Sequence, residues 1–205
     1  MLTNMIQSKY FLIPTLFFVS FIYNSACWAI GPFDYRDPAA KKNWLGNVEK
    51  NHFDKDVEQL KGGIASTTGP FDDLAYTLRV FPNHPRALNS MARYLRQGSN
   101  AIIYKKTADL YFEKAIEFVR DDATVFHLYA IHLQKMGKLS ESLKNYKLAL
   151  KFMPGDPEII YNMGLLYVKL GQYDKALDNA KKVYQPGFLL PGLKNKLIRL
   201  GVWKD

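Results

Sequence analysis

The sequence predicts an all-helical protein made of similar helical hairpins that stack on one another. Apolar residues recur at helical spacing in stretches such as YNMGLLYVKLGQYDKAL, residues 161–177. Small residues return at an interval of 34, because Gly164 follows Ala130 and Gly171 follows Gly137 at that distance. One hairpin cannot bury its own apolar face, so a constant interval of this size predicts a stack of repeated units.

The composition is that of a folded domain that is held together by packing. Of the 205 residues, 48% are hydrophobic and 14% are aromatic, which is enough for a core. Cys27 is the only cysteine, so no disulfide can form within the chain. The formal net charge is +9, and the excess of lysine and arginine lies in the repeats after residue 84.

Residues 1–29 differ in composition from the rest of the chain. A single charge, Lys9, precedes an apolar run over 10–23, and small residues follow. This order is typical of a secretory signal peptide with cleavage after Ala29, so we expect a periplasmic or secreted protein. Two alternatives stay open, namely an uncleaved segment that anchors the protein in the inner membrane and a lipoprotein modified at Cys27.

The interval and the glycine turns divide the remaining chain into four helical units and a closing helix. Between Ala92 and Ala108 the chain is four residues longer than the interval requires, which predicts an extra helical turn over 101–104. Pro186 arrives early in the last repeat, so the second helix there should be short. The expected boundaries are 30–84 for an N-terminal helical region with a degenerate repeat, 85–122, 123–156 and 157–190 for three repeats, and 191–205 for a capping helix.

Both ends of this stack have helix signals of their own. Before the repeats, we expect a short helix over 56–61 and a second helix that ends at Pro82. In the tail, Pro191 suits a first helical position and Gly201 suits the residue after a helix. The tail helix should cap the last repeat through one apolar face, which consists of Leu193, Leu197 and Leu200.

The repeats resemble the tetratricopeptide repeat (TPR). That family has a small residue at position 8 of each unit, alanine at positions 20 and 27, and proline at position 32. In residues 123–156 these positions hold Ala130, Ser142, Ala149 and Pro154. The stretches GPFDYRD, DLAYTLRVFPNHPRAL and LPGLKNKLIRLGVW are further similar to a group of exported bacterial members. The resemblance implies a superhelix of helical hairpins that binds a protein or peptide and is not an enzyme.

The small residue at position 8 has a structural meaning. Glycine inside a helix costs roughly 0.5–1 kcal/mol relative to alanine, so Gly164 should be explained by a close neighbour that needs the space. We expect Ala92, Ala130 and Gly164 to be the packing points between helices.

In this family the first helix of each unit lines the inner, ligand-facing side. Carried over by position, the resemblance implies contact residues that are polar, aromatic and mostly cationic: Arg86, Asn89, Arg93, Arg96, Gln97, His127, Gln134, Lys135, Tyr161, Asn162, Leu165 and Lys169. Such a wall suits an extended peptide with acidic side chains. The family's clamp of paired lysines and asparagines for a carboxylate is not reproduced. The other interpretation is an ordinary solvated helix face.

No catalytic, metal or cofactor site is predicted. His127 and His132 are five residues apart and therefore diverge on a helix, and the sequence has neither a nucleophile elbow nor a glycine-rich phosphate loop. Acidic pairs such as Asp34 with Asp37, or Asp72 with Asp73, suit helix N-termini.

A basic outer stripe offers a second mode of binding. It consists of Lys144, Lys147, Lys151, Lys181 and Lys182. These lysines suit peripheral contact with an anionic polymer or membrane of the cell envelope. We do not expect nucleic acid to be a partner, because no nucleic-acid motif or stacking platform is present.

Overall fold

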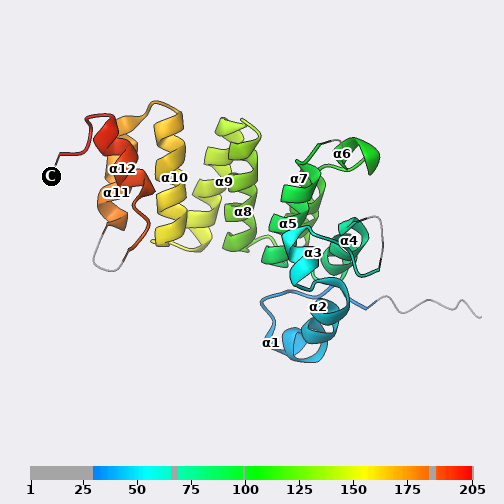
Figure 1. Cartoon of the computed structure of the whole chain (residues 1–205). Helices are drawn as coiled ribbons and strands as arrows, with labels where there is room; N and C mark the ends of the chain where they lie inside the picture. Colours follow the sequence, from blue (N-terminus) through cyan, green and yellow to red (C-terminus); the bar gives the residue numbers. More distant parts are fainter. Residues whose placement is uncertain (1–29, 66–68, 99, 185–187, 205) are drawn as a thin grey trace, which may run out of the picture.

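The computed structural model describes residues 30–65, 69–98, 100–184 and 188–204. These residues form helices and connecting loops, and the helices stack side by side along an elongated body (Figure 1). The expected fold class, an all-α solenoid of helical hairpins, is confirmed. The predicted signal peptide and Cys27 lie outside the described residues. No helix in the described ranges has the length and hydropathy needed to cross a membrane.

Short elements build the N-terminal region. They are α1 (Pro38–Ala40), the π-helical turn η1 (Lys41–Leu45), α2 (Gly46–His52), α3 (Lys55–Gln59) and α4 (Phe71–Val80). Asp37 caps α1, because its side chain accepts a hydrogen bond from the Ala39 N–H, and Asp54 caps α3 in the same way. α4 packs on α2 and on the first helix of the repeats, whereas α3 packs mainly on the latter.

A buried polar junction joins this region to the repeats. Asn83 is 1% exposed, and its amide oxygen accepts a hydrogen bond of 2.8 Å from the Tyr35 N–H. Its amide nitrogen donates to Asp34 at 2.7 Å and to Asp122 at 2.8 Å. Because Asp122 also caps a repeat helix through its other carboxylate oxygen, the junction fixes the N-terminal segment against the repeats.

Three hairpins follow, with an insertion in the first and a single helix at the end. The hairpins are α5 (Pro85–Leu95) with α7 (Ala108–Phe118), α8 (Ala123–Lys135) with α9 (Leu139–Phe152), and α10 (Pro157–Lys169) with α11 (Tyr173–Val183). The insertion is α6 (Asn100–Ile103), which lies where the extra turn is expected, and α12 (Gly192–Arg199) ends the stack.

The small residues at position 8 are buried. Ala92 is 3% and Ala130 is 0% exposed, and Gly164 is also buried. A Cβ atom added at Gly164 would lie 2.5 Å from Leu193 Cδ2 and 3.3 Å from Asn179 Cβ. The space at Gly164 is therefore taken up by α12 and α11.

The capping helix α12 differs from its prediction in its first residue and in one residue of its buried face, whereas Gly201 lies beyond its end with a positive φ, as expected. The helix begins at Gly192, and Pro191 stands at the position before it. Leu193 and Leu197 are fully buried against α10 and α11, but Leu200 is 44% exposed. The prediction that Leu200 shares their buried face is wrong, because the helix ends at Arg199.

Candidate functional site

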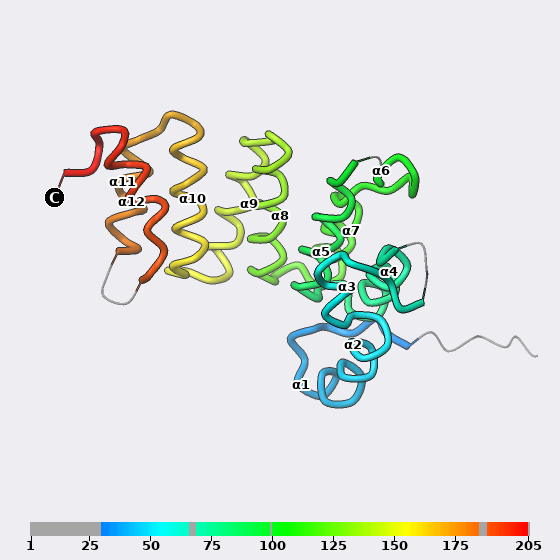
Figure 2. The backbone as a smooth tube through the Cα atoms, viewed as in Figure 1, coloured from blue at the N-terminus to red at the C-terminus, as the bar shows by residue number. Residues whose placement is uncertain are grey.

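The first helices α5, α8 and α10 follow one another along the stack (Figure 2). We call their exposed surface the first-helix wall. Each helix starts at a side-chain cap, supplied by His84, Asp122 and Asp156. Pro85 and Pro157 add a fixed backbone angle at the first helical position. These local signals set where each helix begins, and so which side chains reach the wall.

Three predicted contact residues come together where α5 meets α8. They are Arg93, Arg96 and Lys135. Burial lowers the pKa of Lys135, and the positive charges of Arg96 and Arg93 lower it further. Burial and the charge of Arg93 likewise lower the pKa of Arg96. Within the described residues none of the three has a carboxylate partner, so an anionic group would be attracted here.

A histidine that the sequence does not single out for binding orients Arg96. The Arg96 Nη1 atom lies 2.8 Å from His132 Nδ1. Arginine only donates hydrogen bonds, so Nδ1 must accept and the proton of the neutral ring must be on Nε2. This Nε2 atom lies 3.2 Å from Asp109 Oδ1, and Lys138 donates to Asp109 Oδ2 at 2.9 Å. Burial lowers the pKa of His132, and so does the Arg96 charge, which together favour the neutral ring.

A cavity of about 500 Å³ lies beside this network. Leu95 and Arg96 at the end of α5 line one side, and Lys135 and Met136 at the end of α8 line another. Ala101 of the inserted helix α6 closes a further side. The cavity therefore combines apolar lining with three cations, Arg96, Lys135 and Lys138, and with Asp109, and the insertion forms part of its wall.

Further along the wall, predicted contact residues bond to one another or to the hairpin behind them. The Asn162 amide nitrogen lies 3.0 Å from His127 Nε2, which joins α10 to α8. Burial lowers the pKa of His127, so its ring is neutral and accepts this bond. Gln134 accepts a hydrogen bond of 3.0 Å from the Tyr146 hydroxyl. These side chains are thus held in fixed orientations.

The other predicted contact residues have unequal surroundings. Arg86 forms ion pairs with Glu49 at 2.6 Å and Glu58 at 3.3 Å, so its charge is neutralised by the N-terminal region. Tyr161 packs against Phe188, with 5.4 Å between the ring centroids. The solvent-facing side chains are those of Asn89, Gln97 and Lys169, whereas Leu165 is partly buried. The unneutralised charge of the wall is therefore concentrated between α5 and α8.

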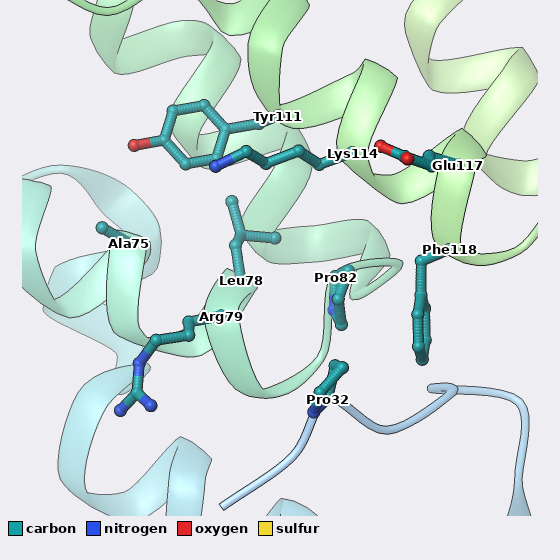
Figure 3. Close-up of a pocket in the computed structure, with 9 residues that line it drawn as sticks. All are labelled: Pro32, Ala75, Leu78, Arg79, Pro82, Tyr111, Lys114, Glu117 and Phe118. Atoms are coloured by element: carbon teal, nitrogen blue, oxygen red, sulfur yellow. The ribbon is translucent and has the colours of Figure 1, made fainter. Parts of the chain in front are cut away.

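A second cavity, of about 780 Å³, lies between α4, α7 and the N-terminal segment (Figure 3). Leu78, Pro82 and Phe118 supply apolar lining, and Arg79 and Lys114 extend along it. None of these residues is predicted as a site from the sequence. No local pattern signals this cavity, because its walls come from segments far apart in the chain.

The lysines of the outer stripe lie on α9 and α11. Lys144, Lys147 and Lys151 line one open hollow of about 510 Å³ together with Leu143 and Leu148. Lys181 and Lys182 are exposed on α11. Across the described ranges, no group of three or more histidine, cysteine, aspartate and glutamate side chains is arranged to hold a metal ion.

Comparison with known proteins supports the repeat. Residues 133–171 match the family model described as "TPR repeat". Over 65 residues the chain is 38% identical to the BBSome complex member BBS4 of Bos taurus, a match that covers 32% of this chain and 12% of that protein. The chain thus matches only about an eighth of that relative's length.

Solved structures of the protein MamA are similar in architecture. One has a TM-score of 0.46 at 17% identity and covers 80% of this chain and 86% of MamA. Another has a TM-score of 0.42 at 15% identity and covers 66% and 68% of the two chains.

Proposed function

Because the chain is a tetratricopeptide-repeat protein, a class that serves as protein-interaction scaffolds, we propose that it binds an acidic segment of a protein partner on its first-helix wall. One observation carries this proposal: Arg93, Arg96 and Lys135 lie close together without a carboxylate partner among the described residues. An acidic segment would offset their mutual repulsion through charge-assisted hydrogen bonds. The protein then acts by binding rather than by catalysis.

The composition of residues 1–29 supports a proposal for the place of action. Residues 1–29 have the order of charge, apolar run and small residues that is typical of a signal peptide. We therefore place the scaffold outside the cytoplasm, in the periplasm or beyond it. Retention by an uncleaved anchor or by a lipid on Cys27 would hold the same wall at the membrane surface.

Charge reversal on the wall tests the proposal. The variant carries Arg93→Glu with Lys135→Glu, and a matched control carries Lys144→Glu with Lys147→Glu on the outer stripe, so both lose the same positive charge. The exported protein is crosslinked in its own cell envelope and its neighbours are recovered. We expect the wild type and the control to recover one protein partner, and the wall variant to lose it. Equal recovery by all three proteins would refute binding at the wall.

The outer stripe supports a second candidate function, contact with an anionic polymer or membrane of the envelope. Its lysines line a shared hollow with two leucines, which combines charge with apolar surface. Under this proposal many anionic species are recovered, and 0.5 M salt removes most of them, because exposed charges are screened. A triple variant with Lys144→Glu, Lys147→Glu and Lys181→Glu should then fail to recover these anionic species. The wall variant should still recover them.

A further inference from the structure

The two long edges of the repeat stack have opposite charge. We call the edge that carries the turns within the hairpins the hairpin edge, and we define it as residues 94–110, 134–141 and 168–175. In Figure 1, α6 and the turns from α8 to α9 and from α10 to α11 lie along this one side of the stack. The other edge carries the turns that join successive repeats, residues 117–125 and 151–159.

The hairpin edge is basic. It holds seven cations against three acidic residues, a net charge of +4; the cations are Arg96, Lys105, Lys106, Lys135, Lys138, Lys169 and Lys175. The other edge holds two cations against five acidic residues, a net charge of −3; the acidic residues are Glu117, Asp121, Asp122, Asp156 and Glu158. Of these two edges, only the hairpin edge would therefore approach a negatively charged surface favourably.

The hairpin edge also presents apolar side chains to solvent. Ile102 and Ile103 of α6 are 79% and 64% exposed, and Met136 in the next turn is 51% exposed. Two adjacent, largely exposed isoleucines serve no packing purpose within the described part of the chain, where they belong to no core cluster. Lys105 and Lys106 follow them after Tyr104 and are exposed as well.

The residues that follow the two isoleucines are held in place by ring contacts and hydrogen bonds. The Tyr104 ring stacks on Phe71 with 3.8 Å between centroids, and the Tyr104 and Tyr94 hydroxyl oxygens lie 3.4 Å apart. The Lys106 N–H donates to the Ala101 carbonyl at 3.1 Å, which closes the turn. α6 is therefore a projection held by aromatic contacts rather than a loose loop. An ordered tip with exposed apolar side chains suits insertion into a lipid surface.

We propose that the hairpin edge docks on an anionic lipid surface, with Ile102 and Ile103 entering the headgroup region and the flanking lysines pairing with lipid phosphates. Exposed apolar residues beside lysines are the combination by which peripheral proteins hold such surfaces. This site is separate from the outer stripe, which lies on α9 and α11. The proposal does not rest on binding at the first-helix wall, although Arg96 and Lys135 border both surfaces.

A local fluorescence readout tests this docking in the full chain. Residues 1–29 contain an apolar run that can itself hold lipid, so total vesicle binding is not informative. The background is Cys27→Ser, with one environment-sensitive dye at Ile103→Cys or, as the matched control on the other edge, at Met153→Cys. The vesicles are phosphatidylcholine alone or phosphatidylcholine with an equal amount of phosphatidylglycerol.

We expect a blue shift of the dye at position 103 with the phosphatidylglycerol vesicles only, and no shift at position 153. Lys105→Glu with Lys106→Glu should weaken this response by at least about thirtyfold in lipid concentration, since each lysine near an anionic surface contributes about 1 kcal/mol and each new glutamate adds repulsion. Lys181→Glu with Lys182→Glu changes the charge equally and should leave it unchanged. A missing shift at 103, an equal shift at 153, an equal shift with phosphatidylcholine alone, or equal loss in both lysine variants would overturn the proposal.

Discussion

Gly164→Ala tests the packing that orders the end of the stack. The added Cβ would lie 2.5 Å from Leu193 Cδ2 and 3.3 Å from Asn179 Cβ. Leu193 is fully buried, so its side chain has little space to rotate away. Overpacking costs about 1–3 kcal/mol, whereas alanine in place of glycine inside a helix contributes about 0.5–1 kcal/mol of stability. The two effects predict a net loss of about 1 kcal/mol in the free energy of unfolding.

Two matched variants separate these effects. Gly46 is also helical, but a Cβ added there meets nothing within 4 Å, so Gly46→Ala should stabilise by about 0.5–1 kcal/mol. Leu193→Ala removes the atom that obstructs the new Cβ, at a cost of about 2–5 kcal/mol. In that background Gly164→Ala should no longer destabilise. The expected coupling between the two substitutions is therefore about 1–3 kcal/mol.

The assay is urea unfolding followed by far-ultraviolet circular dichroism, with the midpoint and the slope compared across the variants. Gly164→Ala should lower the midpoint in the wild-type background, whereas Gly46→Ala should raise it. Our explanation of Gly164 is refuted if Gly164→Ala raises the midpoint as Gly46→Ala does. It is also refuted if Gly164→Ala lowers the midpoint equally with and without Leu193.

Three further predictions concern burial. Burial lowers the pKa of His84 from 6.5 to about 4. Between pH 6.5 and pH 4, His84 is therefore protonated in the unfolded chain and neutral in the folded chain. Stability should therefore fall as pH drops from 6.5 to 4, and His84→Asn, which keeps a capping acceptor, should flatten this fall when the urea midpoint is measured against pH. Asn83→Ala should cost about 1–3 kcal/mol in urea unfolding because it leaves buried partners unpaired, whereas the exposed Asn89→Ala should change stability by less than about 0.5 kcal/mol. Leu197→Ala should lower the melting temperature by several degrees and Leu200→Ala should barely change it; equal shifts would contradict the different burial of these two leucines.

The hairpins from α8 to α11 follow from local signals in the sequence. Asp122 and Asp156 cap the first helices, and Gly137 and Gly171 adopt the positive φ angles that the turns within the hairpins require. Each of these signals lies within a few residues of the helix end that it determines. The interval between repeats then adds the stacking order, so the fold class is predictable without coordinates.

The N-terminal region is less predictable, because its helices depend on distant contacts. Over 38–52, where η1 and α2 form, no pattern in the sequence predicts the helix boundaries. This stretch contains Gly46, and its helical structure is supported by packing of α2 on α4, which buries Val48. The short helix near 56–61 could be expected from its acidic start, but its main packing partner, α5, could not.

The candidate site is likewise predictable only in part from the sequence. Position within the repeat is enough to place Arg93, Arg96 and Lys135 on the first-helix wall. It cannot show that Arg96 is held by His132, because that contact joins α5 to α8, or that Asp109 of α7 lies behind the ring. Nor can it show that Glu49 and Glu58 neutralise Arg86. These pairings depend on how separate helices meet in space.

The charge difference between the two edges has a structural cause that does not extend to α6. Acidic residues at the starts of first helices, such as Asp122 and Asp156, cap those helices, and lysines near their ends, such as Lys135 and Lys169, complement the helix dipole. Stabilising α8 and α10 in this way adds negative charge to one edge and positive charge to the other. The exposed Ile102 and Ile103 contribute nothing to that effect, because α6 is an insertion outside the regular hairpin. The insertion therefore adds apolar surface and two lysines, Lys105 and Lys106, to an edge where helix stability accounts for Lys135 and Lys169, which is why a lipid-binding role is to be tested at α6 rather than at the repeat lysines.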